Sequence, residues 1–259
     1  MNIQLNGSRI AKQEQEWELQ EASHYSQFEM EGEAENEYFF QTMLSSIQKA
    51  AKAAAPIAKQ LAPIAARTLM GAIPRVGAIA SPTAARLISQ WVQEGEMEAV
   101  ALESQFFGSN EMEAEVSNAE TAYEAALTEV LAAEASHSNS ESEAAAFLGS
   151  ALPTLVNSMG GQKALRRILP ILVSANSRLV RLLHRQGTTG QRLLRLIPTI
   201  LRRTVASLRV AAQKGQPMTS DLALRLMASH THRVFGNSQT VTRSMIRNAI
   251  IQRQTVAKG

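Results

Sequence analysis

Apolar and polar residues follow one another at helical spacing along most of the chain. In residues 40–70, apolar side chains recur every three or four positions, while basic residues and two prolines share another face. Residues 110–135 repeat the pattern with glutamates on the polar side. No stretch shows the convincing alternation of a strand. The pattern predicts an all-α fold, with helical bundle segments joined by acidic, partly disordered linkers.

Two apolar stripes define the expected core. The first comprises Phe40, Met43, Leu44, Ile47, Ala51, Ala54, Ile57, Leu61, Ile64 and Ala65. The second comprises Val116, Ala119, Tyr123, Ala126, Leu127, Val130 and Leu131. Pro56 and Pro63 lie on the polar side of the first stripe, where each removes a backbone hydrogen bond. We therefore expect kinks or breaks at these prolines.

Residues typical of helix ends give the bounds of the other helices. Ser81 and Pro82 start a helix that runs from Thr83 to about Gln93. The polar residues 136–142 are the expected main domain boundary. Beyond them we expect helices over residues 162–174, 177–186, 189–214, 219–235 and 239–256.

The charges are strongly segregated along the 259 residues. The chain carries 26 basic and 23 acidic side chains, yet residues 1–143 hold 22 of the acids and residues 144–259 hold 18 of the bases. The two parts have net charges of −14 and +17, and the blocks alternate in a way that suggests a duplicated unit. They define an acidic disordered segment 1–39, a basic Ala-rich helical segment 40–93, an acidic segment with one helix 94–143, and a basic Arg-rich helical domain 144–259.

Between residues 29 and 37 every second residue is a glutamate. A strand with this pattern would bury little and would repel itself, so we expect disorder. An interaction tail or a sorting signal are the functional alternatives. A calcium loop is disfavoured because the Asp/Asn/Gly pattern of such loops is absent.

The most informative pattern is a helix with leucines on one side and arginines on the other, in residues 189–214 and again in 177–186. The candidate residues for binding an anionic surface are Arg178, Arg181, Arg185, Arg192, Arg195, Arg202, Arg203 and Arg209. The open explanations are a solvated bundle face, an anionic membrane surface, nucleic acid, or a protein partner. Such a partner includes the acidic half itself, within one chain or between copies.

Two observations separate these alternatives. Phe147 and Phe235 are the only aromatic residues of the basic half, so a stacking platform for single strands is not evident. Arginine outnumbers lysine there by 15 to 3, which suits bidentate contacts to the phosphates of lipids or nucleic acid. We favour an anionic membrane surface or a protein component of a particle as the partner, with nucleic acid as the alternative.

Recognisable catalytic chemistry is absent from the sequence. There is no cysteine, phosphate-binding glycine loop, His-Glu-x-x-His or Gly-x-Ser-x-Gly motif. His230 and His232 would project about 200° apart on a helix, so we predict surface or capping roles for them. Asp221, the only acid of the basic half, is predicted to start a helix. We expect a non-enzymatic protein without cofactor or metal.

The N-terminus lacks the apolar core of a secretory signal, and no run of 18 apolar residues occurs. We therefore expect the cytoplasm of the producing cell as its location, with any export using a route that reads no such signal.

Several segments carry a family resemblance. After the Glu-x-Glu runs come EAAAFL at residues 143–148, LIPTILRRTVA at 196–206 and THRVFG at 231–236. Together they resemble a poorly characterised bacterial family with acidic Glu-x-Glu segments and Arg-rich helices, some members of which are associated with phage-tail-like contractile injection systems. The resemblance implies a cargo or effector carried by such a particle, and it supplies no catalytic residues.

Overall fold

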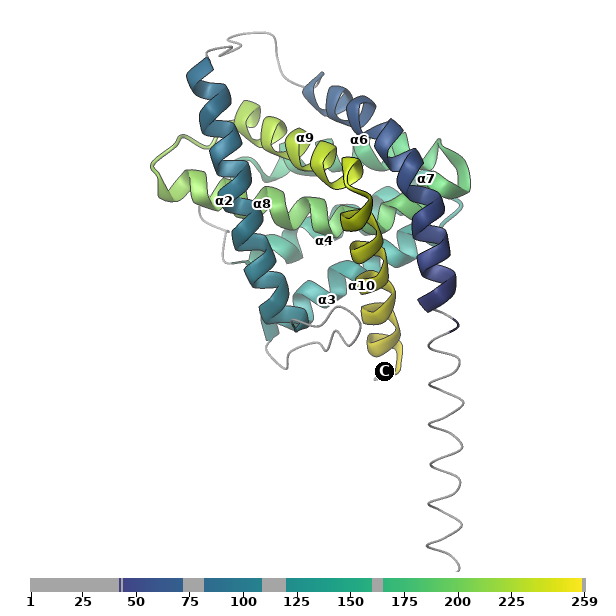
Figure 1. Ribbon diagram of the computed structural model, residues 1–259. Helices are drawn as coiled ribbons and strands as arrows, with labels where there is room; N and C mark the ends of the chain where they lie inside the picture. Colours follow the sequence, from purple (N-terminus) through teal and green to yellow (C-terminus); the bar gives the residue numbers. More distant parts are fainter. Residues whose placement is uncertain (1–41, 43, 72–81, 109–119, 160–164, 258–259) are drawn as a thin grey trace, which may run out of the picture. The chain divides into compact units, whose positions relative to one another are not determined.

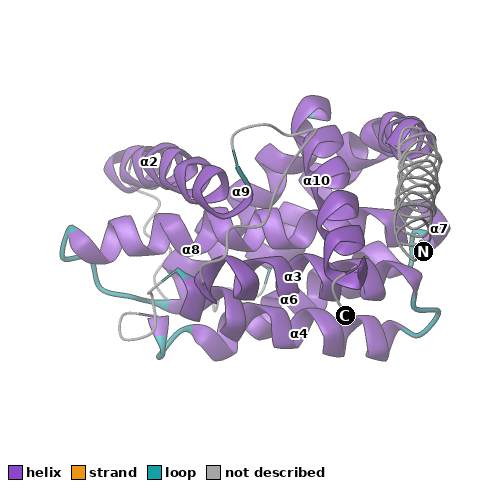
Figure 2. Ribbon diagram, turned by 90° about the horizontal axis from the view of Figure 1, so that it is seen from below, coloured by secondary structure: helices purple, strands orange, loops and turns teal. Residues whose placement is uncertain are grey.

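A computed structural model of the chain describes residues 42, 44–71, 82–108, 120–159 and 165–257. Regular structure in these ranges is helical throughout, which confirms the predicted all-α class (Figure 2). In chain order the named elements are α2 (Pro82–Phe107), α3 (Glu120–His137), α4 (Glu141–Ser158), α6 (Leu169–His184), α7 (Gly187–Leu193), the short 3-10 helix η1 (Leu194–Leu196), α8 (Ile197–Gln213), α9 (Ser220–Gly236) and α10 (Ser238–Ala257). A further helix covers residues 44–70, drawn in purple in Figure 1, and is called the Lys-rich helix.

Contacts within the chain define two compact units, residues 1–46 and 47–259. Helices α2 to α10 and residues 47–70 of the Lys-rich helix all belong to the second unit. The polar stretch 136–142, expected to separate two domains, lies inside this unit as the short turn between α3 and α4, which pack against each other. The acidic segment 1–39 and its predicted disorder lie outside the described residues.

Helix α8 is the central element of this unit. It packs against α2 and α9 and also contacts α3 and α4, so that it lies among the other helices in both ribbon views (Figures 1 and 2). Nearly all of its residues are buried, including Arg202 and Arg203. A solvated arginine face, one of the explanations that the sequence leaves open, does not hold for Arg202 and Arg203 of α8, because both side chains lie between helices.

The predicted helix 189–214 is divided into α7, η1 and α8. Pro198 stands in the first turn of α8, where its missing N–H costs nothing and its fixed φ suits a helix start. Gly190 of α7 approaches the end of α6 so closely that a Cβ there would lie 2.0 Å from the carbonyl oxygen of Leu183. Conversely, parts of the two predicted helices 162–174 and 177–186 form one helix, α6, over residues 169–184. Residues 160–164 lie outside the described ranges.

Helix α2 is longer than predicted. The sequence prediction ends it near Gln93, where the acidic block begins, but the helix continues to Phe107. The residues beyond Gln93 are mostly good helix formers, so the change of charge does not end the helix. Gly108, with φ of 75°, adopts the left-handed conformation typical of a residue that terminates a helix.

Helix α4 is absent from the predicted elements. Its N-cap is Ser140, whose side chain accepts a hydrogen bond from the backbone N–H of Glu143. The spacing Ser-x-x-Glu is the signature of a capping box, so the sequence does carry the signal for this start. Serine and glutamate dominate the composition of this stretch, and composition alone favours a polar break over a helix start.

The two predicted apolar stripes have different outcomes. In the Lys-rich helix the described residues of the stripe are buried or half-buried, except Ile64, which is 49% exposed. The helix runs through the exposed Pro56 and Pro63 without a break. The α3 stripe is wrong in part, because Tyr123 is 65% and Leu127 42% exposed. Phe40, Met43, Val116 and Ala119 lie outside the described residues.

Alanines form most of the buried side of α3, because this helix packs closely against both α4 and α10. The predicted helices near the C-terminus are confirmed as α9 and α10. Thr219 caps α9 by accepting from the N–H of Leu222, and Asp221 lies in the first turn as expected.

Candidate anionic-surface interface

The eight predicted surface arginines have three different environments. Arg202, Arg203, Arg209 and Arg185 are ion-paired with glutamates of the acidic segment 94–143. Arg195 is hydrogen-bonded to the end of α3. Within the described part of the chain, Arg178, Arg181 and Arg192 make no ion pair. The structure therefore leaves only a minority of this set for an external ligand.

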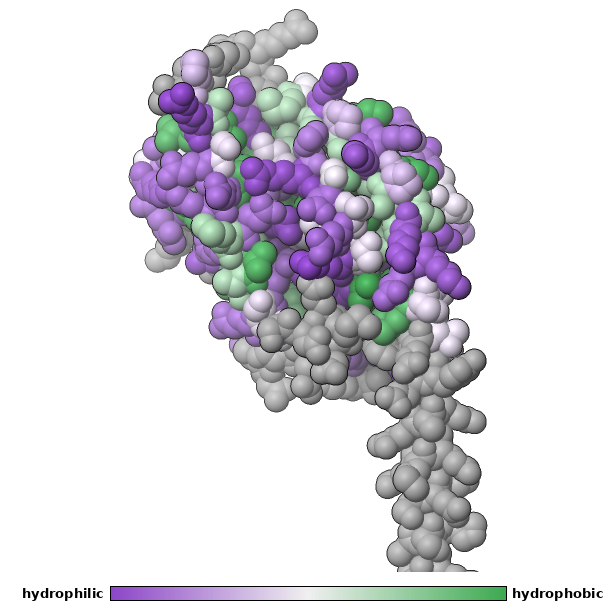
Figure 3. Space-filling model, in the orientation of Figure 1, coloured by the Kyte–Doolittle hydropathy of each residue, from purple (hydrophilic) through white to green (hydrophobic). Residues whose placement is uncertain are grey.

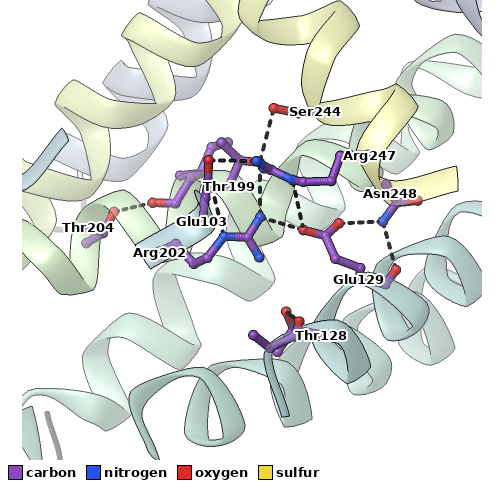
Figure 4. Close-up of polar contacts among 11 residues, drawn as sticks. Glu103, Thr128, Glu129, Thr199, Arg202, Thr204, Ser244, Arg247 and Asn248 are labelled. Carbon is purple, nitrogen blue, oxygen red and sulfur yellow. Dashed lines mark hydrogen bonds and ion pairs between the residues drawn. The ribbon is translucent and has the colours of Figure 1, made fainter. Parts of the chain in front are cut away.

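Arg202 is the centre of a buried ion-pair cluster between α2, α3, α8 and α10 (Figure 4). Its side chain is completely buried. Nε donates to Oε1 of Glu103 at 3.0 Å, and Nη2 donates to Oε1 of Glu129. The guanidinium carbon lies 5.4 Å from the ring centre of Phe107, which adds a cation–π contact. Nη1 is buried without a hydrogen-bond partner.

Helix α10 completes the cluster. Arg247 donates to Oε2 of Glu103 at 2.6 Å and to the hydroxyl of Thr199 at 2.8 Å. Asn248 donates to both the carboxylate and the backbone carbonyl of Glu129, at 2.7 and 2.8 Å. Two arginines thus face two glutamates, and the charges of the cluster balance (Figure 4). Because the cluster carries no net charge, it does not attract an external anion.

The electrostatics of the cluster favour the charged forms. Burial alone would raise the pKa of Glu103, but Arg247 and Arg202 outweigh it and lower that pKa to about 2. Burial likewise lowers the pKa of Arg202 by itself, but the carboxylates of Glu129 and Glu103 outweigh it, so the net shift of this pKa is upward. The pair of Glu103 with Arg202 therefore stays charged at neutral pH.

Further ion pairs lie along the contact of α8 with α2. Arg203 pairs with Glu96, Arg209 with Glu98 at 3.2 Å, and Lys214, just after α8, with Glu94. Arg233 of α9 shares Glu96 with Arg203, at 2.9 Å. Burial, as the largest effect, lowers the pKa of Arg203. The acidic side chains of α2 therefore occupy much of the arginine side of α8.

Arg185 and Arg195 lie nearer the surface. Arg185 is 72% exposed and pairs with Glu141 at 3.4 Å. Arg195 donates from Nε to the hydroxyl of Ser136 at 3.0 Å, and its Nη2 lies 3.1 Å from Nε2 of His137. Burial, followed by the neighbouring Arg192, lowers the pKa of Arg195. Both side chains hold the turn that joins α3 and α4 against the basic half of the chain.

His230 is fully buried, so the predicted surface or capping role is wrong for this residue. Its Nε2 lies 2.7 Å from the hydroxyl of Ser207 on α8, and its Nδ1 is buried without a partner. Burial, together with Arg203 and Arg233, lowers its pKa to about 3, so the ring is neutral. His232 is exposed, as expected. A fully buried Ser–His pair has no route to a substrate, and we assign it to helix packing.

The Lys-rich helix carries one group of exposed basic residues without acidic neighbours; Arg86, Arg166, Arg167, Arg181 and Arg192 are exposed elsewhere in the described residues. Lys49, Lys52, Lys59 and Arg67 are all exposed and share one side of the helix, opposite its buried alanines. Residues 44–71 contain no acid. Hydrophilic side chains line the outward side of this helix in Figure 3. This basic block is visible in the sequence, but the predicted surface lies on the Arg-rich helices instead.

Two other kinds of site are not found in the described part of the chain. No helix there is long and apolar enough to cross a bilayer. No group of three or more histidine, aspartate or glutamate side chains in those ranges is placed to hold a metal ion.

Comparison with protein-family models, with curated proteins and with solved structures finds no match to this chain.

Proposed function

We propose that this protein is a non-enzymatic interaction protein that binds an anionic membrane surface through the exposed face of its Lys-rich helix. The observation that carries the proposal is the acid-free row of Lys49, Lys52, Lys59 and Arg67. The helix is anchored by a buried stripe on its other side, so this row has a fixed orientation toward solvent.

The magnitude of the attraction is sufficient for surface binding. Each basic residue near an anionic leaflet contributes about 1 kcal/mol, and the contributions add while the residues face the same surface. A row of such residues therefore supplies a few kcal/mol at low ionic strength, and salt screens it. The proposed contact is peripheral, since the apolar side of the helix is already used in the core.

Three arginines of the predicted set remain candidates for a second contact. Arg181 and Arg192 are exposed and Arg178 is half-buried, on α6 and α7. The predicted roles of Arg202, Arg203 and Arg209 are not part of the proposal, because their side chains lie between helices and face glutamates.

A membrane is favoured over nucleic acid by one feature of the basic row. Ile64, 49% exposed, lies at the edge of this row, about 60° round the helix from Arg67. An exposed apolar side chain beside cations suits the headgroup boundary of a bilayer, whereas a nucleic-acid backbone offers it no apolar contact. The described residues of the Lys-rich helix also include no aromatic ring on which bases could stack.

Vesicle binding by the full chain tests the proposal. Replacing Lys49, Lys52 and Lys59 with glutamine is expected to weaken binding to vesicles containing phosphatidylserine by about 100-fold. The matched control replaces Arg185, Arg209 and Lys214 with glutamine, since these bases are already paired with glutamates. That control changes the net charge by the same amount and should remain closer to the unmodified protein.

Two results would overturn the proposal. One is equal binding to neutral and anionic vesicles. The other is loss of duplex DNA binding, but not of vesicle binding, in the triple lysine variant. Replacing Arg178, Arg181 and Arg192 with glutamine measures how much the second contact contributes to vesicle binding. We expect a smaller contribution than that of the lysines, because Arg178 is half-buried.

We further propose that the protein is carried as a cargo by a contractile injection particle. The support is the resemblance of its Glu-x-Glu runs and Arg-rich segments to a family with such members. Neighbouring genes for a tail sheath and baseplate, together with co-purification of the chain with the assembled particle, would support this role. A purified particle that lacks the chain would contradict it.

A further inference from the structure

A cavity of about 600 Å³ lies where the end of the Lys-rich helix and the start of α2 meet α9. Its volume is within the range of small-molecule sites, which is about 300–1,000 Å³. Ten residues of these three helices line it. The three helices can be followed in the upper part of Figure 1. None of the four basic residues of the row proposed above lines this cavity.

The lining is apolar on one side and cationic on the other. The apolar residues come from the Lys-rich helix and α2, with Ala228 added from α9. All of the polar residues come from α9: Arg225, Ser229, His232 and Arg233. Their spacing of four, three and one places them along one side of that helix. None of the ten residues is acidic.

The two arginines keep donors available for a ligand. Arg225 uses Nε to bind Asp221 at 2.7 Å, and Arg233 uses Nη1 to bind Glu96 at 2.9 Å. A guanidinium group has five N–H donors, so each arginine is positioned by its carboxylate and still has further donors. Glu96 is shared between Arg233 and Arg203, so it cannot neutralise both of them. The polar side of the cavity therefore retains positive charge.

We propose that this cavity binds an anionic amphiphile, with a phosphate or carboxylate head on Arg225 and Arg233 and a short apolar tail against Met70 and Ile88. Paired guanidinium groups suit such heads, because their N–H groups match the oxygens of phosphate and carboxylate. The apolar side excludes inorganic phosphate as the preferred ligand, since burial of a tail supplies the remaining affinity. The absence of lining acids disfavours cationic ligands.

Calorimetry on the full chain tests the site with decyl phosphate below its micelle concentration. We expect the binding of decyl phosphate to be saturable and clearly tighter than that of inorganic phosphate or of the uncharged decyl maltoside. Ala85 is exposed at the cavity, so Ala85→Phe should block binding with little effect on folding. Equal binding of inorganic phosphate, or no binding of decyl phosphate, would overturn the proposal.

A pair of variants separates ligand binding from stability. Arg225→Gln and Asp221→Asn break the same ion pair, so their effects on folding are similar. Arg225→Gln should weaken decyl phosphate binding about tenfold, the effect of losing a charge-assisted hydrogen bond. Asp221→Asn should leave binding unchanged or tighten it, since it releases a donor of Arg225. Equal weakening by both variants would overturn the assignment of Arg225 to the head group.

The triple lysine variant distinguishes this proposal from the one on membrane binding. Lys49, Lys52 and Lys59 do not line the cavity, so their replacement should leave decyl phosphate binding unchanged. If the triple variant loses both vesicles and decyl phosphate, the two sites are one and this inference is wrong.

Discussion

Helix α8 and the Lys-rich helix have similar sequence patterns and opposite environments. Each has aliphatic residues on one side and bases on the other, and neither contains an acid. In α8 the basic side is enclosed by the glutamates of α2 and α3, and Arg202 is completely buried. In the Lys-rich helix the basic side is exposed. The sequence pattern therefore identifies the apolar and basic sides of each helix. Whether a basic side is exposed depends on where the glutamates of the neighbouring helices lie.

The comparison also separates two roles of charge. Around α8, each buried base is matched by a carboxylate with which it makes hydrogen bonds, and the cluster holds α2, α3 and α10 in register with α8. Breaking a buried pair leaves an uncompensated charge inside the protein, which is expensive. On the Lys-rich helix the bases are solvated, so they cost the fold little and remain available for a partner.

The largest expected effect comes from Arg202→Leu. The variant leaves Glu103 and Glu129 with Arg247 as their remaining cation in the cluster, and it should lower the free energy of unfolding by about 3–5 kcal/mol. Lys52→Leu, on the exposed side of the Lys-rich helix, should change it by less than about 0.5 kcal/mol. Urea denaturation measures both. Similar values for the two variants would remove the distinction between the two helices.

Gly95→Ala tests the closeness of α2 to α8. A Cβ at this position would lie 2.1 Å from Oγ and 2.5 Å from the Cα of Ser207, so the helices must separate. We expect a loss of about 1–3 kcal/mol. The control is Gly149→Ala in α4, where no atom lies within 4 Å of the added Cβ. Removing that helical glycine should stabilise the protein by about 0.5–1 kcal/mol. A stabilising Gly95→Ala would contradict the packing of α2 on α8.

Acidification tests the buried His230. Its pKa is about 3 in the folded protein, against the ordinary histidine value of 6.5, so between these values the unfolded chain binds more protons. Stability contributed by the neutral ring is present above pH 6.5 and is lost as the pH falls toward 3, by about 1.4 kcal/mol per pH unit. The loss is about 2 kcal/mol at pH 5. Glu103 acts in the same direction below pH 4.5. Its pKa is about 2 in the folded protein, against an ordinary value of 4.5, so the unfolded chain takes up this proton first and is stabilised by it.

Unfolding curves of the unmodified chain and of His230→Gln, recorded between pH 7 and pH 5, measure this contribution. The variant has no titrating group at this position, so its stability should depend less on pH over that interval. Parallel pH profiles for the two proteins would show that His230 titrates normally and is therefore not buried.

The smallest expected effect on stability comes from the triple lysine variant of the Lys-rich helix. Solvated bases contribute little to folding, so the free energy of unfolding should stay within about 0.5 kcal/mol of the unmodified value. A loss of several kcal/mol, measured by urea denaturation, would show that these lysines have partners inside the fold.

Much of the fold follows from the sequence in physical terms. Periodicity predicts the all-α class, and the residues Thr219 to Asp221 predict the start of α9. Helix α4 is not among the predicted helices, although Ser140 and Glu143 have the spacing of a capping box. The predicted end of α2 near Gln93 is too early, because helix propensity continues through the glutamates that follow.

The site was harder to predict because it depends on contacts between distant segments. The pairing of Arg202 with Glu103 joins residues 99 positions apart, and that with Glu129 joins residues 73 apart. The sequence does indicate that ion pairs between the two halves are possible, since the acidic and basic blocks have comparable charges and can neutralise each other. The sequence does not specify which bases are matched in this way. The basic face of the Lys-rich helix is visible in the sequence, but the sequence does not show that the bases of α8 are enclosed while those of the Lys-rich helix are exposed.

Residue-resolved labelling of arginines in the native full chain is the sharpest test of whether α8 encloses its bases. Reaction with phenylglyoxal, followed by mass spectrometry, measures the accessibility of each guanidinium group. We predict rapid modification of Arg67, Arg181 and Arg192, and protection of Arg202 and Arg203 until the chain is unfolded in denaturant. Modification of Arg202 and Arg203 at the rate of Arg181 in the native protein would contradict this burial, because α8 would then present its arginines to solvent.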